Sequence, residues 1–221
     1  MDANFFLTSR LDMIAQFYKV AADPFRLIKQ QIEAGDAPYE PPYSEDGEPP
    51  FQVEWSRAED SLKLLGGVCV SLVAGSLQLY LDTIVERYGD IKKFKRITGK
   101  GWLERHQKYF MEHGHDFAKS GADLALLSEV VLARNAVMHH DQITSDVASY
   151  SDDDLNKIPS PFFVSERERE LLDAFEMNTS PWLFPPTIFV DEEKLLRAIV
   201  EVKKLAASVD PYQVPLANKM K

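Results

Sequence analysis

Cysteine is almost absent from this chain: Cys69 is the only one among 221 residues. No disulfide can form within the chain, and a reducing, cytoplasmic compartment is the simpler expectation. Cys69 lies in the apolar run VCVSLV, so we expect an inert core thiol rather than a nucleophile. The sequence also lacks GxSxG, GxGxxG and a glycine-rich loop ending in GK[ST]. The usual signals of serine hydrolases, Rossmann enzymes and P-loop NTPases are therefore missing.

Positive charge is in the minority, with 25 lysines and arginines against 35 aspartates and glutamates and a net charge of −10. A broad, sequence-independent grip on nucleic acid depends on neutralising phosphates, so this balance argues against it but allows a local basic strip. Hydrophobic residues make up 45% of the chain, enough for a sizeable core. The length suits a single domain over residues 1–221, and the first residues predict no secretory signal.

One uncharged run, residues 64–81, raises the question of a membrane, because its length is at the lower edge of a membrane span. Within it, Gly67, Ser71 and Gly75 have the four-residue spacing of small residues in close-packed membrane helices. Polar residues interrupt the run and charges crowd both ends. We therefore expect the central helix of a bundle rather than a membrane partner, with Gly66 and Gly67 at a close helix crossing.

Apolar periodicity predicts a mainly α fold, a bundle of four to five helices with a small C-terminal β hairpin-like element and a final helix. An N-terminal helix over 8–34 should be kinked or split at Pro24. An exposed loop rich in proline and acid follows over 35–54. Core helices are expected within 56–141, at 56–88, 102–113 and 121–139.

The C-terminal part, 160–210, is expected to hold the β element and the last helix. Segments 161–165 (PFFVS) and 186–190 (PTIFV) are typical of short strands. The segment ERERELLDAF between them fits either a helix or a strand. Asp191 should cap the final helix. Residues 145–160 are polar and acidic and predict a loop.

The end of the third core helix carries a group of polar residues in the stretch LARNAVMHHDQI, residues 132–143. On a helical wheel Arg134 falls inside the apolar arc, whereas Ser128, Asn135 and His139 gather at its edge. A buried arginine could pair with Glu129, Asp82 or Glu86, or extend past the end of the bundle. It could instead bind an anion such as phosphate. A neighbouring histidine, which titrates near neutral pH, favours the second interpretation.

The pattern Arg134-Asn135-xxx-His139, at the end of an apolar helix, resembles the motif of HEPN-domain proteins. That resemblance implies a metal-independent endoribonuclease without a cofactor, acting as a homodimer with a composite site. A toxin or phage-defence role, with an antitoxin or regulatory protein as partner, is implied only by the same resemblance. His139 would act as general acid or base, Arg134 would stabilise the phosphorane charge, and Asn135 would orient either group. His140, Asp141 and Ser128 are candidate accessory residues.

A basic strip in the segment IKKFKRITGKGW is the expected place for RNA. Cations beside aromatic rings suit single-stranded RNA, through phosphate contacts and base stacking. The alternative is a solvated loop whose aromatic rings pack inward. The predicted RNA-binding residues are Lys92, Lys93, Lys95, Arg96, Lys100 and Trp102.

Two other functions remain open from the sequence. His106, the doublet His140-Asp141 and a later acid such as Asp173 could mimic the ligand order of HD-type metal-dependent phosphohydrolases. Alternatively, the chain is a non-catalytic HEPN-like module for dimerisation or partner binding, in which Arg134 and His139 make structural contacts. Metal content distinguishes the first alternative, and burial of the two side chains distinguishes the second.

Overall fold

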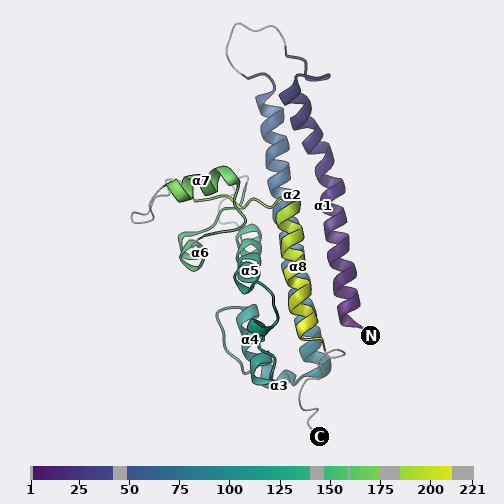
Figure 1. Cartoon of the computed structure of the whole chain (residues 1–221), viewed down its shortest axis with the longest axis vertical. Coiled ribbons are helices and arrows are strands. Elements are labelled where there is room, and N and C mark those ends of the chain that lie inside the picture. The colour runs from purple at the N-terminus through teal and green to yellow at the C-terminus, as the bar shows by residue number, and fades with distance from the viewer. Residues whose placement is uncertain (1, 42–48, 140–146, 159, 175–184, 211–221) are drawn as a thin grey trace.

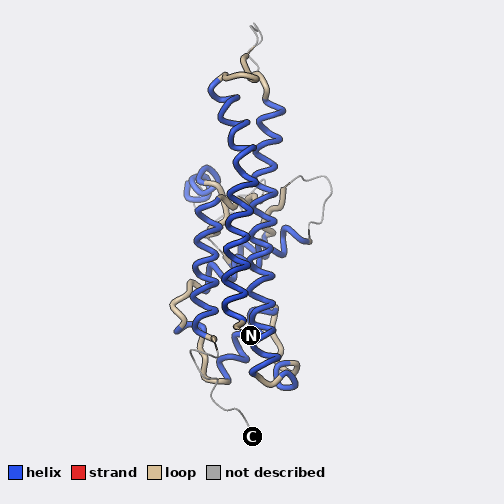
Figure 2. Tube along the Cα trace, turned by 90° about the vertical axis from the view of Figure 1, so that its right-hand side faces the viewer, coloured by secondary structure: helices blue, strands red, loops and turns tan. Residues whose placement is uncertain are grey.

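The computed structural model describes residues 2–41, 49–139, 147–158, 160–174 and 185–210, and it is mainly helical (Figures 1 and 2), which confirms the predicted fold class at that level. None of the described residues forms a strand. In chain order the elements are α1 (Ala3–Ala34), α2 (Gln52–Tyr88), α3 (Ile91–Phe94), α4 (Trp102–Glu112), the 3-10 turn η1 (Phe117–Lys119), α5 (Leu124–Met138), α6 (Asp152–Lys157), α7 (Glu166–Ala174) and α8 (Glu192–Ser208).

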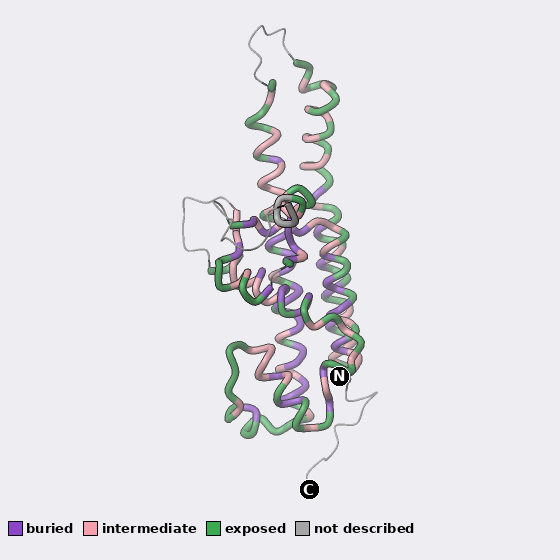
Figure 3. Tube along the Cα trace, turned by 60° about the vertical axis from the view of Figure 1, so that its left-hand side comes forward, coloured by how far each residue is buried: buried purple, intermediate pink, exposed green. Residues whose placement is uncertain are grey.

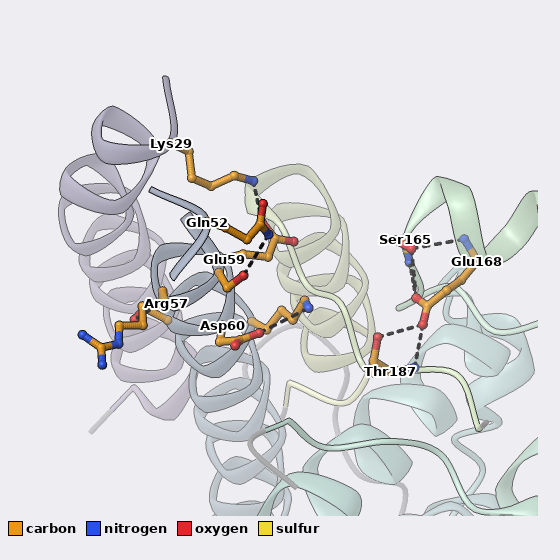
Figure 4. Close-up of polar contacts among 11 residues, drawn as sticks. Lys29, Gln52, Arg57, Glu59, Asp60, Ser165, Glu168 and Thr187 are labelled. Carbon is orange, nitrogen blue, oxygen red and sulfur yellow. Dashed lines mark hydrogen bonds and ion pairs between the residues drawn. The ribbon is translucent and has the colours of Figure 1, made fainter. Parts of the chain in front are cut away.

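Helices α1 and α2 form a long pair whose upper end projects beyond the other helices (Figure 1). Helix α1 begins at Ala3, earlier than expected, because the Asp2 side chain caps it by accepting from the Phe5 amide at 3.0 Å. It continues through Pro24 as one helix, so of the kink or split expected there the split does not occur. Beyond Pro24, Lys29 joins α1 to α2, since its ammonium pairs with Glu59 and lies 4.4 Å from the centroid of the Trp55 ring (Figure 4).

Helix α2 is the central element and packs against α1, α5 and α8. A side chain at Gly66 would overlap the carbonyl oxygen of Val190, and a Cβ at Gly67 would lie 3.0 Å from Val137 Cγ2. The two glycines therefore mark a close crossing, as predicted. Helix α2 is long and apolar enough to cross a membrane, and 61% of its most apolar 18-residue window is buried inside the protein, as in the core helix of a bundle.

Helix α8 lies over α2 in Figure 1 and closes one face of the bundle. Asp191 caps it by accepting from the Lys194 amide at 2.8 Å, as the sequence predicted. Further along, the Tyr80 hydroxyl of α2 donates to the Ala206 carbonyl at 3.0 Å. The buried Glu201 accepts from the Asp123 amide at 2.8 Å and thereby joins α8 to the start of α5. Figure 3 shows that burial is concentrated in this middle region of the bundle.

The expected β element is not formed as strands. Segments 161–165 and 186–190 make one backbone hydrogen bond to each other, from Phe189 to the Phe163 carbonyl at 2.9 Å. Thr187 forms an isolated antiparallel bridge with Ser149. The physical reason is that a side chain, described below, takes two of the backbone amides in the first segment. Glu168 adds a second side-chain connection by accepting from Ser165 and Thr187 (Figure 4).

Several boundaries also differ from the expectation. The ambiguous segment after 165 is the helix α7, and the predicted loop over 145–160 contains the short helix α6. A capping box between Ser151 and Asp154 begins α6, with the Ser151 hydroxyl accepting from the Asp154 amide at 3.2 Å. The loop over 35–54 is shorter than predicted because α2 already begins at Gln52.

Candidate functional site: the motif end of helix α5

The HEPN-like motif lies in the last turn of α5. Asp123 caps the start of the helix by accepting from the Leu126 amide at 3.0 Å. At the other end the His139 amide donates to the Asn135 carbonyl at 2.9 Å, and the backbone then leaves the helical conformation. His139 is therefore the C-terminal cap, and its side chain is exposed. A general acid or base at this place can be reached from solvent.

Arg134 is half-buried, and one of its terminal nitrogens donates to Oδ1 of Asn135 at 2.9 Å. In the described part of the chain its guanidinium forms no salt bridge with the acids expected as partners. Asp82 instead lies 3.1 Å from His106 Nε2, and Glu129 is occupied by other donors. Among the described residues, the guanidinium of Arg134 is thus held by an amide and pairs with no carboxylate. A guanidinium without a carboxylate partner is better suited to bind a phosphate than one that is already part of an ion pair.

Glu129, which the sequence offered only as a partner for Arg134, has a structural role of its own. The residue is 3% exposed, and its carboxylate accepts from the Tyr150 hydroxyl at 2.8 Å. It also accepts from the backbone amides of Phe162 and Phe163, both at 2.8 Å. Burial and the neighbouring carboxylate raise the pKa of Tyr150 well above its usual value, which keeps this hydroxyl a donor. An acid among the apolar residues of α5 was the signal that could have predicted this.

The remaining motif residues share the outer face of α5. Asn135 is half-buried, and Ser128, two turns earlier, is exposed. The Ser128 hydroxyl donates to the Leu124 carbonyl of its own helix at 2.8 Å, so it is not aimed at the motif. His140 and Asp141 lie outside the described residues. The structure therefore places Arg134 and Asn135 in direct contact and His139 beside them at the helix end.

A small cavity adjoins the motif where α5 crosses α2. It has a volume of about 60 Å³ and is lined by Lys63, Leu64, Gly67, Val137, Val147, Ala148 and Ile188. This volume is far below the 300–1,000 Å³ typical of ligand pockets, so it cannot hold a nucleotide. Among the described residues, the open surface formed by Arg134, Asn135 and His139 is the place left for an RNA strand at the motif.

The basic strip follows α2 at the lower end of the bundle (Figure 1). Lys92, Lys93, Lys95, Arg96 and Lys100 are all exposed, as an RNA-contacting surface requires. The aromatic residues are less available. Phe94 is buried under the Arg105 guanidinium, whose carbon lies 4.9 Å from the ring centroid. Trp102 is half-buried with its ring 6.1 Å from that of His106, centroid to centroid. Base stacking on Phe94 is excluded by this packing.

An open groove runs beside the strip, with a volume of about 550 Å³ and a lining of Lys93, Arg96, Ile97, Thr98, Lys108, Met111 and Glu112. Two acids reduce its positive charge. Lys93 pairs with Glu112 at 3.2 Å, and Lys108 pairs with Glu104 at 2.7 Å. Arg96 is the remaining cation of the lining.

The motif and the basic strip are not neighbours within one chain. The motif end of α5 contacts α2 at Gly67, whereas the strip begins after Tyr88. At a rise of 1.5 Å per residue, this length of α2 separates them by roughly 30 Å. The residues predicted as one site therefore occupy two places, and only an extended RNA could contact both.

The described residues do not support the interpretation as a metal-dependent phosphohydrolase. They include no group of three or more histidine, cysteine, aspartate or glutamate side chains able to hold a metal ion. His106 is buried, with Nδ1 2.7 Å from the Trp102 carbonyl and Nε2 3.1 Å from Asp82 Oδ1. Burial lowers the pKa of His106, although the carbonyl and the carboxylate oppose that shift. His140 and Asp141, on which this interpretation depends, are not described, so it stays a prediction.

Comparison with known proteins returned no matching family model, no matching curated protein and no matching solved structure. The HEPN resemblance therefore rests on the motif and on the helical architecture around it.

Proposed function

We propose that the chain is a HEPN-like, metal-independent RNA endonuclease that acts as a homodimer. The observation that carries this proposal is the contact between Arg134 and Asn135 beside the exposed His139, with no acid neutralising the guanidinium in the described part of the chain. Internal attack by a ribose 2′-hydroxyl requires proton transfer and stabilisation of negative charge, and no metal is obligatory for either.

In this proposal His139 removes the proton from the 2′-hydroxyl, or donates one to the leaving 5′-oxygen. Arg134 binds the non-bridging oxygens as the phosphorane forms, and Asn135 holds the guanidinium in place. Two copies of the motif supply the base and the acid. The bond from the 2′-oxygen to phosphorus forms and the bond to the 5′-oxygen breaks, which leaves a 2′,3′-cyclic phosphate. A toxin or phage-defence role, regulated by an antitoxin, is the biological setting that the resemblance implies.

The test is cleavage of a mixed RNA pool by the purified chain in excess chelator. We expect cyclic phosphate ends from the wild type and loss of cleavage in His139→Ala. Ser128→Ala is the matched control, because it changes the same face of α5 without touching the motif. Activity that appears only with added manganese would instead support the HD-type phosphohydrolase. Cleavage that persists in His139→Ala would refute the assigned chemistry.

One observation favours a second candidate, the non-catalytic module. In the described part of a single chain, the cavity beside the motif is far smaller than a nucleotide, and the basic strip lies at the far end of α2. If the wild type cleaves no RNA with chelator or with metal, Arg134 and His139 are contacts in a protein interface. Their substitution by alanine would then change partner binding rather than a reaction rate.

A further inference from the structure

The face of α2 opposite α8 carries a row of exposed apolar side chains. Leu64 is 60% exposed, Val68 40%, Leu72 38% and Leu79 56%. Neighbouring members of the row are four or seven residues apart along the helix and therefore share one face. Single exposed apolar residues are normal, but a continuous row of four on one helix is typical of an interaction surface.

Gly75 lies in the middle of this row, and no contact within a single chain explains why a glycine is needed there. Gly75 is exposed, and a Cβ built there would meet nothing within 4 Å. Gly66 and Gly67 differ, because neighbouring elements fill the space beside them. A glycine in a helix interior is less stable than an alanine, so a helix keeps one where another backbone comes close. The missing side chain at Gly75 indicates that another helix packs on this face.

The order of residues on this face identifies the packing partner. Leu64 and Leu79 are equally far from the point between Ser71 and Leu72, and so are Val68 and Gly75. A helix related by a two-fold axis through that point runs antiparallel and brings each residue against its mate. Val68 then packs into the space left by the partner's Gly75. We propose that a second copy of the chain docks antiparallel on this face of α2.

Charge supports the same register. Arg57 and Glu86 are both exposed on this face, one beyond each end of the apolar row, and they share the midpoint between Ser71 and Leu72. Figure 4 shows the Arg57 side chain pointing away from the other residues drawn. Within the described part of the chain neither residue forms a salt bridge. In the antiparallel pair, Arg57 of each copy faces the partner's Glu86, which gives two ion pairs at the rim.

Helix α1 widens the face. Its exposed residues Phe6 and Met13 lie beside Leu79, at the lower end of the row. A groove of about 470 Å³ between the two helices is lined by Ala3, Phe6, Leu7, Ser9, Arg10, Met13, Ser76, Leu79, Tyr80, Thr83 and Arg87. From Arg57 to Glu86 the face is about 40 Å long at 1.5 Å per residue, and two helices are about 20 Å wide. That area matches the roughly 800 Å² per partner of a stable dimer.

The dimer also places the two motifs. The proposed two-fold axis is perpendicular to α2 and lies in the plane between the two copies. Helix α5 of each copy is therefore on the same side of the dimer. Because α5 crosses α2 at Gly67, the two crossings are about 14 Å apart along α2, at 1.5 Å per residue. One short RNA strand can span that distance. This step rests on the proposed function, whereas the dimer itself does not.

The first experiment measures the oligomeric state of the full chain by sedimentation velocity across a concentration series. We expect a dimer in the wild type and a dissociation constant at least about 100-fold weaker in Leu72→Glu, because two carboxylates then meet on the axis. Leu196→Glu is the matched control, since Leu196 is 44% exposed on α8, on the other side of the bundle. A monomeric wild type, or equal effects of both variants, would overturn the inference.

The second experiment tests the direction of packing. Arg57→Glu and Glu86→Arg should each weaken the dimer, and the double variant should recover it. A cysteine at position 64 should cross-link under oxidation only when mixed with a chain that carries Leu79→Cys. Cross-linking of Leu64→Cys to itself would indicate a parallel dimer and refute the proposed register.

The outcomes for dimer and enzyme are separable. His139→Ala should remain dimeric, because His139 lies outside the row. A dimer that cleaves no RNA would leave this inference standing and remove the proposed function. An active monomer would overturn this inference together with the homodimer of the proposed function, and would leave only the assigned RNA-cleavage chemistry standing.

Discussion

Arg134 donates to Oδ1 of Asn135, its neighbour in the chain, at 2.9 Å. Adjacent residues on a helix usually point apart, so this contact requires the arginine to fold back along the end of α5. One of the five N–H donors of the guanidinium is thereby used, and the group keeps its full charge. In the proposed function, an arginine held in this way binds the phosphate at the helix end.

The first prediction concerns Asn135. In Asn135→Asp a carboxylate replaces the amide that accepts from Arg134 and neutralises its charge. If Arg134 binds phosphate, we expect at least a tenfold lower rate of RNA cleavage. Unfolding free energy should change by less than about 0.5 kcal/mol, because the site lies at the surface. Initial rates and urea unfolding measure the two quantities. Equal losses in Asn135→Asp and Ser128→Ala would mean that the amide has no role in orientation.

The second prediction concerns Glu129. In Glu129→Ala, the Tyr150 hydroxyl and the amides of Phe162 and Phe163 lose their acceptor inside the protein. Each unsatisfied buried donor costs about 1–3 kcal/mol, so we expect a loss of at least about 3 kcal/mol in unfolding free energy. Tyr150→Phe removes only one donor and should cost about 1 kcal/mol. If urea unfolding shows equal costs for both variants, the backbone amides do not depend on this carboxylate.

The third prediction compares two glycines of α2. Gly66→Ala forces a methyl group against the Val190 carbonyl and should destabilise the chain by about 2 kcal/mol or more. Gly75→Ala meets open space within one chain and should stabilise an isolated monomer by about 0.5–1 kcal/mol. The same change should weaken the proposed dimer, because the methyl group takes the space for the partner's Val68. Stability should be measured in the Leu72→Glu background, where α2 is unpaired. Destabilisation by Gly75→Ala in that background would contradict the reasoning.

The long elements could be predicted because each is decided by its own residues. The apolar run after Leu64 and the cap at Asp191 specify α2 and α8 locally. The structure of the region after Pro161 could not be predicted, because Glu129 of a distant helix takes the amides of Phe162 and Phe163 and these residues form no strand. The same limit applies to the site. The Arg134–Asn135 contact is local, whereas the distance of the basic strip from the motif depends on where α5 crosses α2.

The last prediction is a loss of stability in mild acid. Burial lowers the pKa of His115, a shift that the nearby His113 increases and the Ser208 backbone opposes. Burial also lowers the pKa of His106. Both are neutral in the folded chain, whereas the unfolded chain takes up protons near pH 6.5. The stability that these two neutral histidines contribute is therefore complete above that pH. It is lost as the pH falls through their lowered pKa values.

Urea midpoints at pH 7.5, 6.5 and 5.5 measure this effect, and His115→Gln should reduce the slope between the last two. Asp90, Glu104 and Glu201 also have lowered pKa values, but their carboxylates contribute only to the loss below about pH 4.5, outside this window. An unchanged slope in His115→Gln would show that this histidine gains no proton on unfolding. The remaining slope would then belong to His106, whose ring faces Asp82 and lies near Arg105.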